Sequence, residues 1–355
     1  MLPGSKSGKI VLERTASPAS VVPPPALGGR RVELDSSAAG PLSCYQDGPA
    51  VRARCSTPLL LIHGINAASS AYEVKPLYDY YARERPVYAL ELPGFGYSGR
   101  TDRLHTPRLM TDAIHSSVTH IQRELNCRAI DALALSLSAQ FLARAAVEAP
   151  ASFRSIGLVN PAGFAGERLS VGRTESTLGR VWLRSLLKGL RMRRGLYRML
   201  THRRMMQRYL QRTWGSCQID SRLLNYGCLT SRPAGAEFAA IDFLTGYLFS
   251  GDSGTVYRKL TIPVWVVHGN HGDFCDFRAL RQMSDCPNWT IEVLATGALP
   301  HFERPGEFIR RYDDWSAQLQ TRCGQEPEAR ARSSDAQLTR RSPSSATAQL
   351  ADVSA

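Results

Sequence analysis

The sequence predicts an α/β fold, in which a mostly parallel sheet is covered by helices on both faces. Hydrophobic residues make up 43% of the 355 positions and charged residues 21%, the composition of a globular protein with a full core. Short apolar runs alternate with segments whose apolar residues recur at helical spacing. Apolar runs of this kind are typical of strands buried on both faces of a parallel sheet.

The apolar runs predict six main strands, and a short edge pair before Tyr45 includes Arg31 to Leu34. The six strands are Pro58 to Ile62, Pro86 to Leu92, Ala129 to Leu135, Ser155 to Val159, Val264 to His268 and Thr290 to Leu294. Helical patterns fall near Val74 to Glu84, Leu109 to Leu125, Ala139 to Glu148, Phe277 to Ser284 and Pro305 to Leu319.

The two ends of the chain differ in composition from the part between them. Residues 1–29 are rich in Pro, Ser and Gly, and residues 321–355 are dominated by Ser, Ala, Gln, Arg and Glu. We expect both segments to be disordered. The core is then formed by residues 30–162 and 255–320, and residues 163–254 are an insertion between its two parts.

A serine follows the apolar run Ile130 to Leu135, and a helical pattern begins directly after it. Ser136 therefore lies on a strand-to-helix turn, the arrangement of a nucleophile elbow. Such an elbow needs small residues two positions before and after the serine, and Ala134 and Ser138 are both small. The backbone N–H of Leu137 is then placed to stabilise an oxyanion. A structural serine within an apolar run is the alternative interpretation.

Further motifs support the first interpretation. They are Leu61-Ile62-His63-Gly64-Ile65-Asn66, Glu91-Leu92-Pro93-Gly94-Phe95-Gly96-Tyr97-Ser98, Ile262-Pro263-Val264-Trp265-Val266-Val267-His268-Gly269 and Gly297-Ala298-Leu299-Pro300-His301-Phe302-Glu303-Arg304-Pro305. Together with the serine turn, they resemble the α/β-hydrolase family over roughly residues 58–319. The resemblance implies an α/β-hydrolase core with an inserted helical cap, a second oxyanion N–H from Ile65 or Asn66, and no cofactor.

The resemblance also implies an acid that orients a catalytic histidine. In the family this acid lies in the loop after the strand that here ends at His268-Gly269. The usual spacing selects Asp273, and Asp276 is the alternative. Turn or helix-capping roles are the structural interpretation of both aspartates.

The base is where this sequence departs from the family. Ala298 stands where members usually have the histidine that acts as general base. We expect His301, three residues further on, to act as a displaced base, and His271 in the preceding loop is the alternative. Without an imidazole, a serine hydroxyl is a poor nucleophile at neutral pH.

The insertion at residues 163–254 is strongly basic and rich in Leu, Met and Arg, and it carries most of the formal net charge of +13. Apolar residues occupy one helical face and basic residues another between residues 180 and 191. Three interpretations remain open: a solvated cap helix over the active site, an interfacial helix that makes weak contact with anionic membranes, or a site for acidic substrates. Nucleic acid is disfavoured, because nothing else in the chain resembles a binding module.

The remaining features bound the class of protein. No stretch approaches the roughly 18 to 20 consecutive apolar residues of a membrane span, and no apolar block near the N-terminus forms a signal peptide, so we expect a cytoplasmic protein. The 8 cysteines are scattered without metal-ligand spacing, which predicts reduced thiols and no metal site. The leading prediction is a serine hydrolase that acts on an ester or related acyl bond of a small, largely apolar substrate. The alternative is a degraded hydrolase that binds a ligand or a partner.

Overall fold

The computed structural model describes residues 22–49, 57–189 and 193–319. An eight-stranded sheet has the strand order β1-β2-β4-β3-β5-β6-β7-β8. The strands are β1 (Arg30–Ser36), β2 (Gly40–Asp47), β3 (Leu59–Ile62), β4 (Val87–Glu91), β5 (Ile130–Leu135), β6 (Phe153–Val159), β7 (Val264–Gly269) and β8 (Trp289–Leu294). All pairs from β4 to β8 are parallel, whereas β2 is antiparallel to β1 and β4. The predicted mostly parallel sheet is confirmed.

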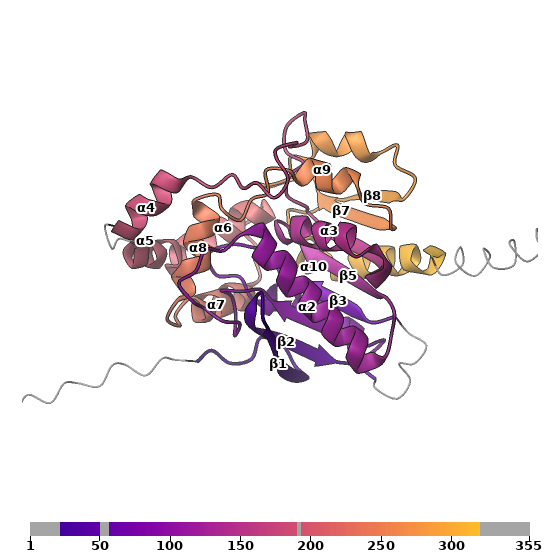
Figure 1. Cartoon of the computed structure of the whole chain (residues 1–355), viewed down its shortest axis with the longest axis horizontal. Helices are drawn as coiled ribbons and strands as arrows, with labels where there is room; N and C mark the ends of the chain where they lie inside the picture. Colours follow the sequence, from indigo (N-terminus) through magenta and orange to yellow (C-terminus); the bar gives the residue numbers. More distant parts are fainter. Residues whose placement is uncertain (1–21, 50–56, 190–192, 320–355) are drawn as a thin grey trace, which may run out of the picture. The chain divides into compact units, whose positions relative to one another are not determined.

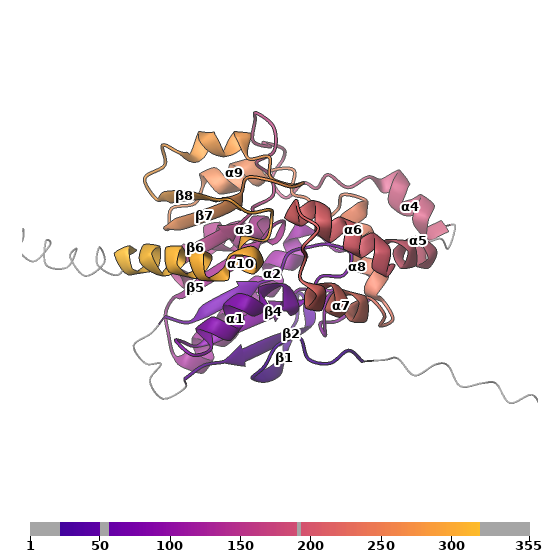
Figure 2. The same ribbon diagram turned by 180° about the vertical axis from the view of Figure 1, so that it is seen from behind.

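Three helices pack on the sheet, with α2 and α3 on one face and α1 on the other (Figures 1 and 2). Their bounds are α1 (Lys75–Tyr81), α2 (Pro107–Leu125) and α3 (Ser138–Glu148). Shorter elements are η2 (Ala71–Val74), η3 (Pro150–Ser152), α9 (Ser253–Arg258), η4 (Arg278–Met283) and α10 (Pro300–Glu303). A helix spans residues 305–319, and from residue 306 on it belongs to a second unit, residues 306–355, of which only the part up to 319 is described.

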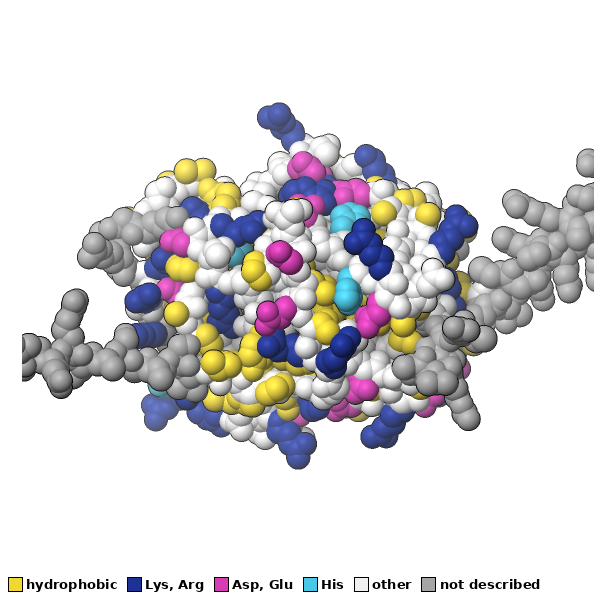
Figure 3. Space-filling view, turned by 60° about the horizontal axis from the view of Figure 1, so that its bottom comes forward, with side chains coloured by type: hydrophobic (Ala, Val, Ile, Leu, Met, Phe, Trp, Pro, Cys, Tyr) yellow, Lys and Arg dark blue, Asp and Glu magenta, His cyan; other side chains and the backbone are white. Residues whose placement is uncertain are grey.

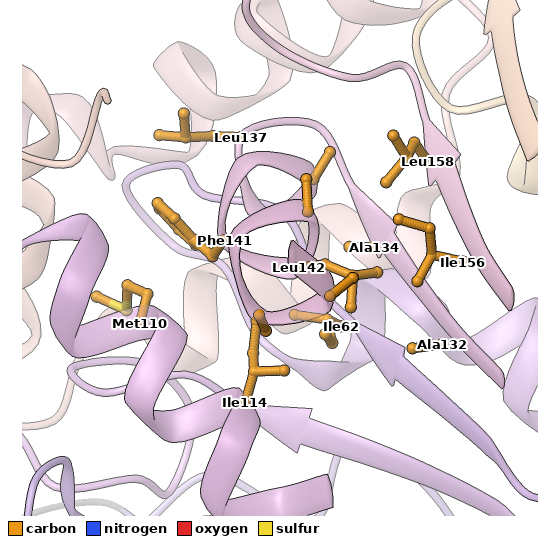
Figure 4. Close-up of a cluster of buried hydrophobic side chains, with 14 of the residues drawn as sticks. Ile62, Met110, Ile114, Ala132, Ala134, Leu137, Phe141, Leu142, Ile156 and Leu158 are labelled. Carbon is orange, nitrogen blue, oxygen red and sulfur yellow. The ribbon is translucent and has the colours of Figure 1, made fainter. Parts of the chain in front are cut away.

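The core between the sheet and the helices α2 and α3 is apolar because parallel strands carry hydrophobic side chains on both faces. Figure 4 shows Leu142 of α3 pointing toward Ile62 of β3, whereas Phe141 lies on the side of α3 that faces Met110 of α2. All four side chains are fully buried. Burial of side chains of this size contributes roughly 1.5–3 kcal/mol each, so this layer holds the turn between β5 and α3 in place.

The described part of the segment predicted to be a cap contains five helices. They are α4 (Val181–Gly189), α5 (Arg193–Leu200), α6 (Arg203–Trp214), α7 (Ser221–Thr230) and α8 (Ala236–Leu244). All five lie in the sequence between β6 and β7, so they form an insertion between two neighbouring strands of the sheet. A buried cluster links them to the core: Asp242 of α8 accepts hydrogen bonds from the backbone N–H and the Nδ1 of His105, 2.8 and 3.0 Å away, and from Arg184 of α4 at 2.6 Å.

Most of the predicted N-terminal arm and C-terminal tail lies outside the described residues. Residues 22–29, which the sequence analysis placed in the arm, are described. Ala26 and Leu27 are buried, and the Ala26 N–H donates to the Tyr45 hydroxyl at 3.0 Å. The Tyr226 hydroxyl of α7 donates to the Pro24 carbonyl at 2.7 Å. This short segment therefore contacts both the sheet and the cap.

Candidate active site

Ser136 occupies the turn between β5 and α3. Its φ angle is 51°, in the left-handed region that residues other than glycine rarely adopt. The Ser136 N–H donates to the Val159 carbonyl at the end of β6, 2.8 Å away, and the residue is partly exposed. Strain of this kind costs roughly 1–3 kcal/mol and persists only where the surroundings enforce it.

Two small residues, Ala134 and Ser138, allow the surrounding structure to hold Ser136 in this strained conformation. Ala134 is fully buried and pairs in register with Ile62 of β3 and Leu158 of β6. Ser138 is also fully buried, and its hydroxyl donates to the His63 carbonyl at 2.6 Å. The hydroxyl thus ties the start of α3 to the loop that follows β3. A glycine at position 138, as in the usual motif, lacks this hydrogen bond.

The loop Gly64 to Asn66 passes directly beside the serine. A Cβ placed on Gly64 would lie 3.6 Å from Ser136 Cβ. The Asn66 N–H donates to the Ser69 hydroxyl at 2.7 Å and is therefore occupied. By contrast, the N–H groups of Ile65 and Leu137 have no hydrogen-bond acceptor within the described ranges. Of the two residues proposed from the sequence for the second oxyanion donor, Ile65 is the one whose N–H is available.

Glu73 was not singled out by the sequence, although it holds this loop. Its carboxylate is buried; Oε2 accepts the Gly64 N–H at 2.9 Å and Oε1 accepts the Asn66 Nδ2 at 2.6 Å. Burial raises the pKa of the carboxyl group to about 7 in spite of these hydrogen bonds, which favour the charged form. The only sequence signal was an acidic residue next to apolar ones in Ala71–Val74.

His301 lies in α10 and is fully buried. Its Nε2 is 2.7 Å from the backbone carbonyl oxygen of Glu73. Since a carbonyl only accepts hydrogen bonds, Nε2 carries the proton of the neutral ring and Nδ1 is the basic atom. Burial lowers the pKa of the imidazole to about 4, so it is a weak base.

Ala298, at the usual position of the base, lies against the end of α6. Its N–H donates to the Thr213 carbonyl at 2.9 Å. A Cβ placed on Gly297 would lie 2.5 Å from the carbonyl oxygens of Thr213 and Trp214. The loop after β8 is therefore packed tightly against the backbone of a cap helix, and Gly297 is required for that contact.

The candidate acids have partners other than histidine. Asp273 Oδ2 is 2.6 Å from Arg212 Nη2, and its N–H donates to the Arg212 carbonyl at 2.8 Å. Asp276 accepts the Gly166 N–H at 3.0 Å and pairs with Arg278 at 2.9 Å. Both aspartates thus link the loop after β7 to neighbouring segments.

The alternative base, His271, is partly exposed at the same loop. Its Nε2 is 3.9 Å from Glu303 Oε2, and its Nδ1 is 3.0 Å from Asn270 Oδ1. Burial raises the pKa of the Glu303 carboxyl group, whereas the backbone N–H of Gly297 and the nearby His271 lower it. An acid for His271 is therefore present in α10, outside its own loop.

Two aromatic rings are exposed at the carboxyl edge of the sheet. Asn160, which directly follows β6, donates through Nδ2 to the Phe274 carbonyl at 3.0 Å. The Phe274 ring lies 5.9 Å from that of Tyr209 on α6, and these residues are 60% and 40% exposed. The hydroxyl end of Tyr209 is buried although the residue is partly exposed; this burial raises the pKa of the hydroxyl, and the Glu73 carboxylate raises it further. Tyr209 therefore brings an apolar ring of the cap close to the loop beside Ser136.

The part of the chain that the structure describes offers no metal site and no helix that could span a membrane. There, no three His, Cys, Asp or Glu side chains are grouped to hold a metal ion. The six cysteines within the described ranges are free thiols. None of the described helices is both long and apolar enough to span a membrane.

Comparison with known proteins identifies the family. The sequence model of the alpha/beta hydrolase family matches residues 59–311. The chain belongs to the alpha/beta hydrolase family. The match runs from β3, through the helices α4 to α8, to α10 and includes the segments that surround Ser136, whereas β1 and β2 precede it. None of the curated protein sequences compared with this chain matches it significantly.

Solved structures of other hydrolases are similar in fold. A thermophilic esterase from Thermogutta terrifontis is 16% identical, with a TM-score of 0.61 over 82% of this chain and 99% of that one. A serine hydrolase of carbazole degradation is 15% identical, with a TM-score of 0.62 over 81% and 100%. An epoxide hydrolase is 16% identical, with a TM-score of 0.61 over 82% and 99%. At such identities the likeness extends to the fold, and the fold alone does not select the bond that is cleaved.

Proposed function

We propose that this alpha/beta hydrolase is a serine hydrolase that cleaves an ester or related acyl bond of a small, largely apolar substrate. Ser136 is the nucleophile, and the N–H groups of Leu137 and Ile65 stabilise the oxyanion that forms when its Oγ attacks the carbonyl carbon. The observation that carries the proposal is the strained φ of 51° at Ser136, on a turn beside two N–H groups without acceptors in the described structure. The exposed rings of Tyr209 and Phe274 suit an apolar substrate group.

The proton of Ser136 needs an acceptor. We assign this role to His301, through Nδ1, because its Nε2 is bound to the Glu73 carbonyl. The buried ring is a weak base, so slow turnover is expected in this conformation. His271, which has Glu303 nearby, is the alternative base.

A second function is supported by one specific observation. Ala298 stands at the usual position of the base, and the Asp273 carboxylate pairs with Arg212 instead of a histidine. The same loops then form a binding site for an apolar ligand or a partner without chemistry. This alternative predicts a folded protein that does not turn over esters.

Labelling with a fluorophosphonate probe tests the nucleophile. We expect the wild type to be labelled and Ser136→Ala to remain unlabelled, because the elbow presents the Ser136 hydroxyl beside two oxyanion donors. Ser216→Ala is the matched control, since Ser216 is an exposed serine of the cap. Labelling of Ser136→Ala at the wild-type level would refute the nucleophile, and an unlabelled but folded wild type would favour the binding protein.

Hydrolysis of a short-chain p-nitrophenyl ester tests the base. In His301→Gln the side-chain amide can still donate to the Glu73 carbonyl, but it has no basic nitrogen. We expect this variant to lose about 10² to 10⁴ in rate if His301 is the base, and His271→Gln to behave like the wild type. The opposite pattern would assign the base to His271. An inactive wild type that gains activity in Ala298→His would identify a hydrolase that has lost its base.

A further inference from the structure

The cap exposes an apolar helix face. Val181 and Trp182 at the start of α4 are 69% and 65% exposed, Leu186 one turn later is 47% exposed, and Leu178 just before the helix is 57% exposed. The spacing of four residues places Trp182 and Leu186 on the same side of the helix, and Val181 and Leu178 extend the exposed apolar surface toward its N-terminus. Leu187 points the other way and is buried. Helix α4 is therefore apolar on its outer face as well as on part of its inner face.

Exposed apolar side chains are concentrated in the cap. Of the 13 large hydrophobic residues that are exposed in the described part of the chain, nine lie in residues 163–254, so the exposed apolar surface belongs mainly to the inserted segment. On the face drawn in Figure 3, apolar side chains form one larger area toward the lower left and smaller areas among basic and acidic side chains. A contiguous exposed apolar surface in a folded protein marks a contact with another molecule or with a membrane.

The charge of the same segment is positive throughout. Residues 177–219, which include α4, α5 and α6, contain no Asp or Glu. Four exposed arginines of this segment, Arg180, Arg198, Arg204 and Arg208, form no ion pair with any residue that the structure describes. Other arginines of the segment form ion pairs with acidic residues outside it, as Arg184 does with Asp242. The segment thus carries unneutralised positive charge as well as an exposed apolar face.

This combination selects one kind of partner. A second copy of the chain docked on the same face would place two segments without acidic residues against each other, which is unfavourable for a symmetric contact. A soluble anion would leave the apolar face in water. An anionic bilayer satisfies both features, because apolar side chains enter the interface while arginines contact lipid headgroups. Tryptophan at such a boundary places its ring at the level of the headgroups.

We propose that the outer face of α4, together with the free arginines of α5 and α6, docks on the surface of an anionic lipid bilayer. The α4 helix is held to the body of the molecule through Arg184 and Asp242, so docking needs no rearrangement of the cap. Figure 1 shows α4 and α5 together at one end of the cap. This docking does not depend on the proposed chemistry at Ser136.

Flotation of the full-length protein with vesicles tests the proposal. We compare phosphatidylcholine vesicles with vesicles that also contain phosphatidylglycerol, at low and high salt. Binding is expected only to the anionic vesicles and is expected to weaken with salt. Equal binding to both lipids, binding that salt does not change, or no binding at low salt would each overturn the proposal.

Two variants separate charge from apolar contact. Arg204→Gln with Arg208→Gln should weaken binding up to about 25-fold, since each basic residue near an anionic surface contributes about fivefold. Trp182→Ser should weaken it about tenfold or more through lost apolar burial. The matched control is Arg83→Gln with Lys259→Gln, which removes two exposed charges outside the cap and should bind like the wild type.

Two further results, one from the control variant and one from the protein without lipid, would contradict the docking proposal. Weakening by the control as large as that of the cap variants would show that net charge alone is responsible. Self-association in the absence of lipid that Trp182→Ser abolishes would assign the face to a second copy of the chain. Fluorophosphonate labelling of the same samples reports on Ser136 independently of docking.

Discussion

Replacement of Glu73 by glutamine tests whether a buried carboxyl group holds the loop beside Ser136. The ordinary pKa of a glutamate is close to 4.5, and burial raises that of Glu73 to about 7. Between these values the unfolded chain releases its proton while the folded protein keeps it, so the free energy of unfolding falls as the pH rises. The shift corresponds to a loss of about 3 kcal/mol in the free energy of unfolding. This loss is absent below pH about 4 and complete above pH about 7.

Glu73→Gln removes this titration and keeps the shape of the side chain. Its amide can accept only one of the two hydrogen bonds that Gly64 and Asn66 donate to the carboxylate, which costs about 1–3 kcal/mol at every pH. The diagnostic quantity is therefore the slope. The free energy of unfolding of the variant, relative to the wild type, should rise by about 3 kcal/mol between pH 4 and pH 8.

Urea unfolding at a series of pH values measures this difference. Groups that face Glu73, such as Tyr209 of the cap and the ring of His301, are present in both proteins, so their titrations cancel in the comparison. Asp79→Asn is the matched control, because this helix carboxylate of α1 is 48% exposed and its removal changes the net charge equally. Parallel profiles for the wild type and Glu73→Gln would refute the raised pKa and the argument from burial.

Two further substitutions test the packing of the loops around the site. Gly96→Ala should cost about 3 kcal/mol or more in urea unfolding, since its Cβ would lie 2.0 Å from the side chain of buried Glu91 at a φ of 53°. Gly28→Ala is the control, with no atom within 4 Å of the new Cβ, and an equal loss in both would contradict the steric argument. Asp242→Asn should cost about 3 kcal/mol, because the buried Asp242 carboxylate is the counter-charge of the partly buried Arg184. A loss below about 1 kcal/mol would show that the cluster between cap and core contributes little.

The sheet could be predicted from the sequence because its strands are buried on both faces. The runs predicted at Ala129 to Leu135 and Val264 to His268 are β5 (Ile130–Leu135) and β7 (Val264–Gly269), within one residue at each end. The helix predicted near Val74 to Glu84 differs more, because α1 ends at Tyr81. The bounds of a second helical segment were predicted closely, but its type was not. The segment near Phe277 to Ser284 forms a 3-10 helix over Arg278–Met283.

The contacts that hold the loops of the site could not be predicted, because their partners come from distant parts of the sequence. His301 binds the carbonyl of Glu73, 228 positions away, and no local pattern encodes that contact. The packing of Ala298 against Thr213 likewise depends on where the cap returns to the core. These contacts decide which candidate side chains are buried.

What the sequence determined by itself was the family, the order of the strands along the chain and the serine between β5 and α3, since periodicity and small residues at fixed spacing are local properties. The tertiary structure decided which N–H beside the serine is available: Ser69 occupies that of Asn66, while that of Ile65 has no acceptor in the described structure. It also decided that the carboxylate of Glu73 lies behind this loop. The physical reason is that hydrogen-bond acceptors and desolvation depend on which atoms the folded chain brings together, and spacing along the sequence carries no information about that.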